Sequence, residues 1–188
     1  MLTTNYVALL WGIWLAGWVI SSGATAKTVF QAPRTSQLAH SLFVSAGALL
    51  LFFHPSNLAP FRHHLFSSPG WVGWLPVALV AIGLGFAGWA RYHLGRMWSG
   101  RVTLKENHAI IRTGPYAIVR HPIYTGLFVA LIGSFLADPT LASVAGLGLL
   151  TIGLLIKIGQ EEELLTEHFG DSYDSYRRNV STLIPYVW

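Results

Sequence analysis

The chain has 188 residues, of which 53% are apolar and only 11% are charged, with a formal net charge of +4 and no cysteine. Soluble domains carry about 25% charged residues, so this composition does not suit a water-exposed surface. Disordered chains are poor in aromatic residues, whereas this chain has 8 Trp, 7 Tyr and 10 Phe. The absence of cysteine excludes disulfides, thiolate zinc sites and cysteine nucleophiles. An integral membrane protein is the class that remains.

Three apolar segments occupy residues 1–90. Residues 1–26 carry no charged side chain and can cross about 30 Å of hydrocarbon as one helix. No basic segment precedes this run, so we interpret it as a retained span rather than a signal peptide. A second apolar run covers 38–53, and a third covers 71–90 with tryptophans near both ends, where an aromatic belt would lie. These residues therefore predict three N-terminal spans.

Two shorter apolar runs, 123–137 and 141–156, lie on either side of Asp138-Pro139. Each is shorter than the ~20 residues that usually cross a bilayer, so they predict a tight helical hairpin packed within the protein. Glycines in both runs would let the two helices approach closely: Gly126, Gly133, Gly146, Gly148 and Gly153. Pro122 fits the first turn of the fourth helix, where a missing N–H group costs nothing.

The predicted fold is all-α and polytopic, a single domain over residues 1–188 with about five transmembrane helices. If the N-terminus lies outside, every one of the 12 Lys and Arg residues except Arg62 lies on the inner side, as the positive-inside rule requires. The C-terminus is then cytosolic, and a bacterial inner membrane or an endoplasmic reticulum membrane satisfies this orientation equally. The same asymmetry accounts for the net positive charge without a nucleic-acid partner.

The polar stretch ahead of the fourth helix contains two motifs, Gly114-Pro115-Tyr116 and Arg120-His121-Pro122-Ile123-Tyr124. The first is a turn signal, and the second leads directly into the helix. The N-terminus of that helix has unpaired N–H groups and the positive end of its dipole, which together suit a ligand carboxylate. His121 and Tyr124 are three residues apart, so one turn of helix presents both side chains to the same cavity.

A second polar stretch follows the fifth apolar run and begins with Lys157 and Glu161-Glu162-Glu163. Lys157 and Glu161 are four residues apart, so they share a face where the helix leaves the membrane. The two stretches place an imidazole, a carboxylate, an ammonium group and aromatic rings at one depth beside apolar helices. A flat, charged cofactor and an apolar co-substrate can meet at such a place.

Each of these features also has a purely structural interpretation. His121 can cap or pack the start of a helix, and Glu161-Glu162-Glu163 can form a solvated face. Lys157 can extend its ammonium group from a helix end to the interface, and Tyr116 and Tyr124 can anchor that interface. We expect no metal, because the histidines outside these stretches lack nearby acidic residues.

The motifs together, over residues 98–185, resemble those of the isoprenylcysteine carboxyl methyltransferases, integral membrane enzymes that use S-adenosylmethionine (AdoMet). The resemblance implies a cytosolic cofactor pocket between the Arg120–Tyr124 motif and the C-terminal helix, within a cofactor-binding and catalytic part over 91–188. The residues that it implies for cofactor binding are Arg101, His108, Ala109, Ile110, Ile111, Tyr116, His121, Pro122, Ile123, Tyr124 and Glu161. It also implies catalytic roles for Lys157 and Glu161, with Lys157 binding the acceptor carboxylate where those enzymes have arginine.

The reaction that the resemblance implies is methyl transfer from AdoMet to the carboxylate of a lipophilic acceptor such as a prenylated cysteine, with S-adenosylhomocysteine as product. A carboxylate is already an anion at neutral pH, so this reaction needs no general base. A methyltransferase acting on a phospholipid, or on a small lipophilic amine or thiol, is an alternative. For an amine it would need a base, with His108 or Glu162 as candidates. An NADPH-dependent membrane reductase of the sterol-reductase type, which the acidic run disfavours, and a non-catalytic membrane scaffold also remain open.

Overall fold

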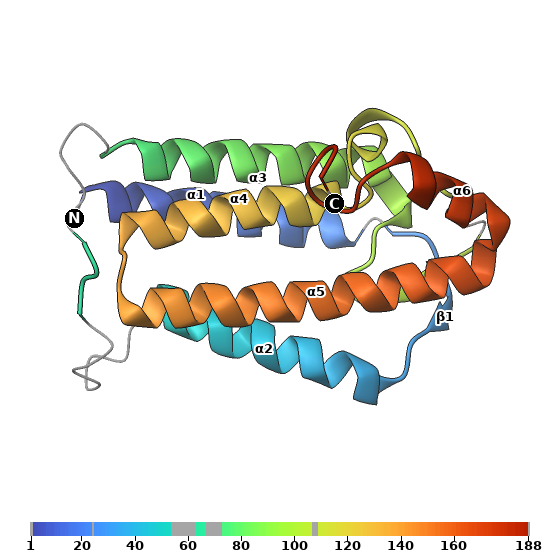
Figure 1. Cartoon of the computed structure of the whole chain (residues 1–188), viewed down its shortest axis with the longest axis horizontal. Helices are drawn as coiled ribbons and strands as arrows, with labels where there is room; N and C mark the ends of the chain where they lie inside the picture. The colour runs from blue at the N-terminus through green and yellow to red at the C-terminus, as the bar shows by residue number, and fades with distance from the viewer. Residues whose placement is uncertain (1, 24, 54–62, 67–72, 107–108, 188) are drawn as a thin grey trace.

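The computed structural model describes residues 2–23, 25–53, 63–66, 73–106 and 109–187, and most of them are helical (Figure 1). The α-helices in this part of the chain are α1 (Leu2–Ser22), α2 (Arg34–Phe52), α3 (Leu75–Leu94), α4 (Pro122–Ala137), α5 (Leu141–Phe169) and α6 (Asp171–Asn179). Two short 3-10 helices, η3 (Gly95–Met97) and η4 (Gly114–Ala117), lie between α3 and α4. The five apolar runs of the sequence therefore correspond to α1 to α5, and Pro122 begins α4 as predicted.

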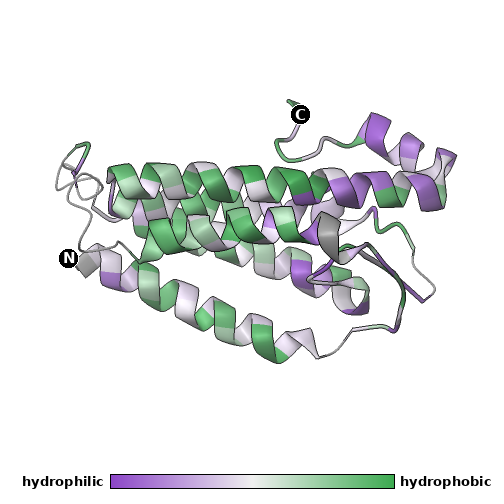
Figure 2. Ribbon diagram, turned by 90° about the horizontal axis from the view of Figure 1, so that it is seen from below, coloured by the Kyte–Doolittle hydropathy of each residue, from purple (hydrophilic) through white to green (hydrophobic). Residues whose placement is uncertain are grey.

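Three helical stretches are long and apolar enough to cross a membrane: Thr3–Ser22, Leu75–Met97 and Leu141–Phe169. The apolar segments of α2 and α4 are shorter, at Gln37–Phe52 and Pro122–Ala137. Figure 2 shows apolar residues along most of the length of these helices. The chain is therefore an integral membrane protein, with three full-length candidate spans in the described residues where the sequence predicted about five.

Helix α5 is much longer than its apolar run, which ends at residue 156. It continues through Lys157 and Glu161 to Phe169, because the residues of this extension are mostly good helix formers such as Glu, Leu and Gln. Figure 2 shows the change from apolar to hydrophilic residues along this helix. Lys157 and Glu161 consequently lie on the turns of α5 directly beyond its apolar part.

The helices pack as two close pairs, α3 with α4 and α2 with α5. Between α3 and α4, a Cβ atom at Gly126 would lie only 2.4 Å from the backbone oxygen of Gly83. Between α2 and α5, a Cβ atom at Gly146 would lie 2.8 Å from the backbone oxygen of Gly47. Helix α1 joins the first pair through a cluster that contains Val7 and Val80.

This pairing differs from the sequence prediction, in which the fourth and fifth helices packed against each other as a tight hairpin. A short turn at Asp138 does connect α4 to α5, but the glycines predicted to lie between them contact other helices. Gly133 faces Pro76 and Leu79 of α3, and Gly153 faces α2, while Gly148 has no atom within 4 Å of a built Cβ. The physical reason is that α3 and α2 also carry small residues at the crossing points, which permits closer backbone approach there.

A two-stranded antiparallel ribbon pairs β1 (Thr28–Gln31) with β2 (Thr103–Lys105), and the sequence did not predict it. The Lys105 ammonium group donates a hydrogen bond to the Thr28 hydroxyl over 3.0 Å. Burial lowers the pKa of Lys105 from its usual value. The ribbon fixes the segment after η3 against the α1–α2 connection, at one end of the helices.

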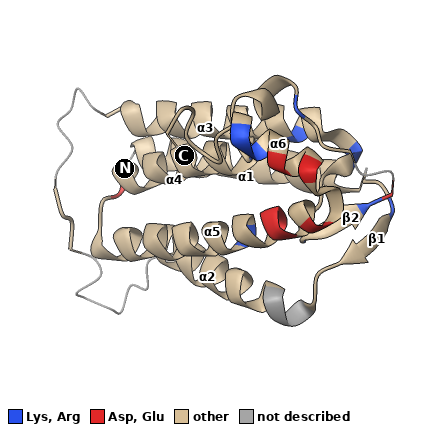
Figure 3. Ribbon diagram, turned by 45° about the vertical axis from the view of Figure 1, so that its right-hand side comes forward, with Lys and Arg blue, Asp and Glu red and all other residues tan. Residues whose placement is uncertain are grey.

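The C-terminal segment folds back onto the start of α4. Gly170 has φ of 51°, a left-handed conformation that glycine adopts without strain and that separates α5 from α6. Beyond α6, the backbone N–H of Arg120 donates to the carbonyl of Ser181 over 2.8 Å, and that of His121 donates to Thr182 over 3.1 Å. Figure 3 shows Lys, Arg, Asp and Glu gathered at this end of the molecule, where α6 and the ribbon lie.

Candidate active site

A cavity of about 490 Å³ lies at the charged end, where the apolar parts of several helices meet the polar segments. Its wall is formed by residues of α1, α2, α4 and α5, by the segment 94–103, and by Tyr116 of η4. Ligand sites in proteins are typically about 300–1,000 Å³ and mostly apolar with a few polar groups, which is the character of this wall. The two polar stretches that the sequence singled out therefore contribute to one cavity.

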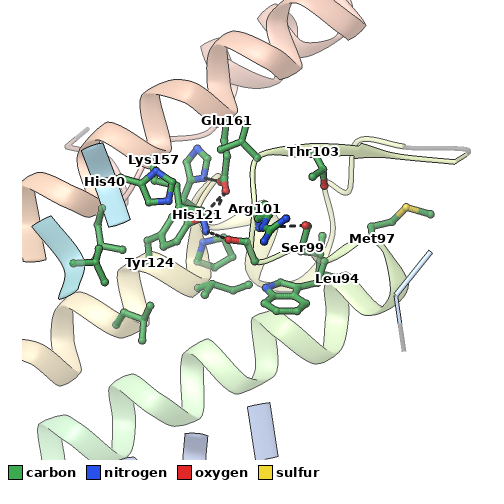
Figure 4. A pocket seen from close by; sticks show the side chains of 18 of the residues that line it. His40, Leu94, Met97, Ser99, Arg101, Thr103, His121, Tyr124, Lys157 and Glu161 are labelled. Atoms are coloured by element: carbon green, nitrogen blue, oxygen red, sulfur yellow. Dashed lines mark hydrogen bonds and ion pairs between the residues drawn. The ribbon is translucent and has the colours of Figure 1, made fainter. Parts of the chain in front are cut away.

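The carboxylate of Glu161 is the centre of the polar part of the cavity (Figure 4). The Tyr124 hydroxyl donates a hydrogen bond of 2.7 Å to Glu161 Oε1. His121 Nδ1 lies 3.7 Å from the other carboxylate oxygen, Oε2. Helices α4 and α5 are thus joined across the cavity by the residues that the motifs predicted to share it.

Lys157 lies one turn before Glu161 and faces the same cavity. Its Nζ atom is 4.0 Å from Glu161 Oε1 and donates a 2.8 Å hydrogen bond to the backbone carbonyl of Gly100. It also lies 5.7 Å from the ring centre of Tyr124. Lys157 therefore holds the 98–103 segment against α5, in addition to contributing a positive charge to the wall.

Arg120 and Glu162 form a second, more buried layer behind these residues. Arg120 NH2 lies 2.8 Å from Glu162 Oε1, and His121 Nε2 lies 3.2 Å from the same oxygen. Arg120 also donates to the backbone carbonyls of Arg177 and Val180 and, over 2.7 Å, to the Thr182 hydroxyl. One guanidinium therefore connects α5, the start of α4 and the C-terminal segment. The ring of His121 is held beside it, with Nδ1 facing Glu161 and Nε2 facing Glu162.

Tyr116 closes the cavity on the η4 side. Its backbone carbonyl accepts a 2.6 Å hydrogen bond from the Tyr176 hydroxyl of α6. Burial, and then the negative charge of Glu161, raises the pKa of Tyr116 well above its usual value, so its phenol stays protonated. Burial likewise raises the pKa of Tyr176 to about 12. Both rings are consequently neutral at physiological pH.

Eight of the predicted site residues lie on the cavity wall: Arg101, Tyr116, His121, Pro122, Ile123, Tyr124, Lys157 and Glu161. Ala109, Ile110 and Ile111 do not, which departs from the expectation that they line the pocket. Ile111 instead packs outside the cavity against Ala90, Tyr116 and Ile123. His108 lies outside the described residues.

Sequence reasoning missed a large part of the wall. Trp14 and Trp18 of α1, whose rings stack at 4.4 Å, and His40 of α2 all line the cavity. These residues come from helices whose only signal was hydropathy, which does not separate a lipid-facing side from a cavity-facing side. The ion pair of Arg120 and Glu162 was missed for a different reason, because its partners lie 42 positions apart.

The donor set of the cavity fits AdoMet, which carries a sulfonium, an ammonium group, a carboxylate and an adenine ring. Glu161 offers a carboxylate for the positive end, and the rings of Tyr116 and Tyr124 offer faces for cation–π contact. Thr103 also belongs to the wall, and its buried hydroxyl has no hydrogen-bond partner among the described residues. No group of three or more His, Asp or Glu that could hold a metal occurs in the same part of the chain.

A membrane-embedded helical protein with a cavity at its charged end is the class that these features define. A family model for the isoprenylcysteine carboxyl methyltransferase family matches residues 74–167, which is half of the 188 residues. The chain belongs to this family. The match covers α3, α4, nearly all of α5 and both motifs, and it therefore confirms the resemblance drawn from the motifs.

Curated proteins similar to this chain include methyltransferases and a metal-resistance protein. Protein-S-isoprenylcysteine O-methyltransferase of Schizosaccharomyces pombe is 34% identical over 101 residues, which are 52% of this chain and 43% of the relative. Methanethiol S-methyltransferase of Crocosphaera subtropica is 38% identical over 74 residues, 38% of this chain and 28% of the relative. The nickel-cobalt-cadmium resistance protein NccN of Alcaligenes xylosoxydans xylosoxydans is 28% identical over 115 residues, 60% of this chain and 52% of the relative. The matches thus cover about half of each relative or less.

Proposed function

We propose that this protein transfers a methyl group from AdoMet to a lipophilic acceptor held in the cavity. The observation that carries the proposal is the contact of Tyr124 with Glu161, 2.7 Å across a cavity that continues into the apolar part of the helices. A polar binding site for a charged cofactor and an apolar site for a lipophilic acceptor are continuous there. Membership of the methyltransferase family supports the same reaction.

The residues of the polar part would hold the cofactor, with Glu161 at its positive end. When bound, AdoMet supplies a methyl group on a positively charged sulfonium. Tyr116 and Tyr124 would place ring faces near that charge, a contact worth roughly 0.5–2 kcal/mol. His121, held by Glu161 and Glu162, positions the start of α4 rather than moving a proton, because both of its nitrogens already face carboxylates.

The apolar part would hold and align the acceptor. Methyl transfer requires the two reacting atoms in line and water excluded, so alignment and desolvation are the main contributions of the chain. Lys157 is the residue that we propose binds an anionic acceptor, such as the carboxylate of a prenylated cysteine. To bind it, the ammonium group would use an N–H that does not already donate to Gly100.

We place the cavity at the cytosolic side of the membrane. The charged end of the molecule in Figure 3 carries the basic residues that the positive-inside rule assigns to the cytosol. An AdoMet pool in the cytosol then reaches the site directly, while the acceptor arrives through the bilayer.

Thermal unfolding in detergent with added AdoMet, S-adenosylhomocysteine or NADPH tests the proposed class. We expect AdoMet and its product to raise the unfolding temperature and NADPH to leave it unchanged. A radiolabelled methyl-transfer assay with lipophilic acceptors then measures the reaction. A response to NADPH alone would support the reductase, and no response to any of the three would support a scaffold; either result refutes the proposal.

A further inference from the structure

A second, smaller pocket lies at the charged end of the molecule, between α6 and the C-terminal segment. Its volume is about 360 Å³. The last turn of α6, residues of the segment 180–187 and Arg120 form its wall. Arg120 also lines the larger cavity of the candidate active site. The two spaces are therefore neighbours that share one guanidinium group, and the second has no part in the cofactor site described above.

This second pocket lies where the apolar part of the molecule meets the polar part. Arg120 precedes the first residue of α4 by two positions, and α4 is apolar along most of its length. The Thr125 hydroxyl of α4 donates a 2.8 Å hydrogen bond to the carbonyl of Leu183, so the C-terminal segment lies against the first turn of this helix (Figure 1). We therefore expect the membrane surface at the level of this pocket.

The second pocket carries an excess of positive charge. The Arg178 side chain is exposed and forms no hydrogen bond or ion pair within the part of the chain that the structure describes. Arg177 lies 3.6 Å from Glu162 and 3.8 Å from Asp174. Glu162 also pairs with Arg120 at 2.8 Å. Three guanidinium groups thus face two carboxylates, and the charge of Arg178 is the one without a partner.

The donors around this pocket suit a phosphate group. The planar fork of an arginine donates two parallel hydrogen bonds to phosphate oxygens. The Ser181 hydroxyl accepts a 3.1 Å hydrogen bond from the backbone N–H of Tyr186, so its own proton is left to donate. Arg177 and Arg178 are exposed and Ser181 is partly exposed, so a ligand can reach all three.

Apolar side chains at the same pocket favour a lipid over a free phosphate ion. Tyr186 and Val187 belong to its wall and are 101% and 76% exposed, and Ile184 beside them is 53% exposed. Apolar surface gains free energy by leaving water, and tyrosine is enriched where a membrane meets water. A phosphate ion would leave these side chains in water, whereas a phospholipid covers them with its glycerol and upper acyl groups.

We propose that this pocket binds the phosphate headgroup of an anionic phospholipid, with Arg178 as the main ionic contact and Tyr186 against the glycerol part. The cytosolic leaflet, where we placed this end of the molecule, is rich in anionic lipids, and basic pockets at its surface bind their headgroups. One bound lipid would contact both α6 and the C-terminal segment. Binding involves no covalent step and does not depend on methyl transfer.

Native mass spectrometry of the full chain in a neutral detergent measures lipid binding directly. The probes are dioctanoyl phosphatidylglycerol, dioctanoyl phosphatidylcholine and inorganic phosphate. The first two differ in net headgroup charge, and the third is the bare anion without apolar groups. We expect phosphatidylglycerol to bind about 5-fold or more tightly than phosphatidylcholine, and inorganic phosphate not to bind at the same concentration.

Substitutions of exposed side chains locate the binding site. Arg178→Gln should weaken phosphatidylglycerol binding about 5-fold, and Arg178→Glu should weaken it further. Arg96→Gln is the matched control, because Arg96 is also exposed but lines neither pocket, and it should leave binding unchanged. Tyr186→Ala should weaken the binding of phosphatidylglycerol as well, since the lipid loses its apolar contact.

Three results would overturn this inference. Equal binding of the two lipids would show that headgroup charge is not recognised. An equal loss of binding in Arg178→Gln and Arg96→Gln would show that the lipid responds to overall charge and not to this pocket. Binding of inorganic phosphate as tightly as phosphatidylglycerol would favour a soluble phosphate ligand. AdoMet binding is measured separately, so each of these results leaves the proposed function standing, and loss of AdoMet binding leaves the lipid site standing.

Discussion

Replacing Glu161 by glutamine is expected to weaken AdoMet binding by about 10- to 100-fold. The substitution keeps the shape of the side chain and the contact with Tyr124 but removes the negative charge that lies between Tyr124, His121 and Lys157. A unit charge 4 Å away interacts with a carboxylate by about 4 kcal/mol at an effective dielectric constant of 20. Desolvation and the nearby Lys157 ammonium offset part of this, which leaves about 1.5–3 kcal/mol, or one to two powers of ten in affinity.

Calorimetric titration of the parent protein and of Glu161→Gln with AdoMet and with S-adenosylhomocysteine measures this effect. S-adenosylhomocysteine lacks the sulfonium charge, so Glu161→Gln should reduce the preference for AdoMet over its product. The matched control is Glu163→Gln, an exposed residue two positions away that does not line the cavity. Equal AdoMet affinity in Glu161→Gln and the parent protein would refute the electrostatic reasoning.

Three further substitutions test the surroundings of the site. Lys157→Ala should slow transfer to a carboxylate acceptor at least 10-fold while changing AdoMet affinity little; an unchanged rate at saturating acceptor would remove Lys157 from acceptor binding. Arg120→Ala leaves Glu162 buried without its ion-pair partner and should lower the free energy of unfolding by about 3–5 kcal/mol, measured by denaturant in detergent. Tyr176→Phe should cost about 1 kcal/mol for the lost bond to Tyr116. Because the folded-state pKa of Tyr176 is raised to about 12, this tyrosine favours the folded state below pH 10, its ordinary value, and the benefit is lost as the pH rises from 10 to 12. The parent protein should therefore lose more stability than Tyr176→Phe over that interval.

The sequence predicted the helices well and their packing partners poorly. Apolar runs located α1 to α5, because burial in lipid or protein demands apolar residues at nearly every helical position. The same uniform hydropathy hides which helix faces which, so the glycines of α4 and α5 were assigned to each other. In the structure Gly126 contacts α3 and Gly146 contacts α2, since those helices also present small residues. Complementary shape, not hydropathy, selects these pairs.

Some residues of the site could be predicted from their spacing in the sequence, whereas others are brought to it only by tertiary contacts. His121 and Tyr124 share a face by helical spacing, as do Lys157 and Glu161, and the structure brings both pairs to one cavity. The ribbon that carries the 98–103 segment has no strong periodicity, and His40 is one of several polar residues in the first half of α2. Neither has a local pattern that would associate it with the two motifs.

The two motif stretches come together because each contributes buried charged side chains that need a partner in the other. A buried carboxylate or guanidinium in apolar surroundings is tolerated only when it is paired and hydrogen-bonded. Glu162 satisfies this condition through Arg120 and His121, and Arg120 through Glu162 and three groups of the C-terminal segment. The same pairing that makes Arg120 and Glu162 tolerable therefore draws α5 onto the start of α4. It leaves Glu161, one residue earlier on the helix, turned into the cavity, where it accepts the hydrogen bond from Tyr124 and where a positively charged ligand has room to bind.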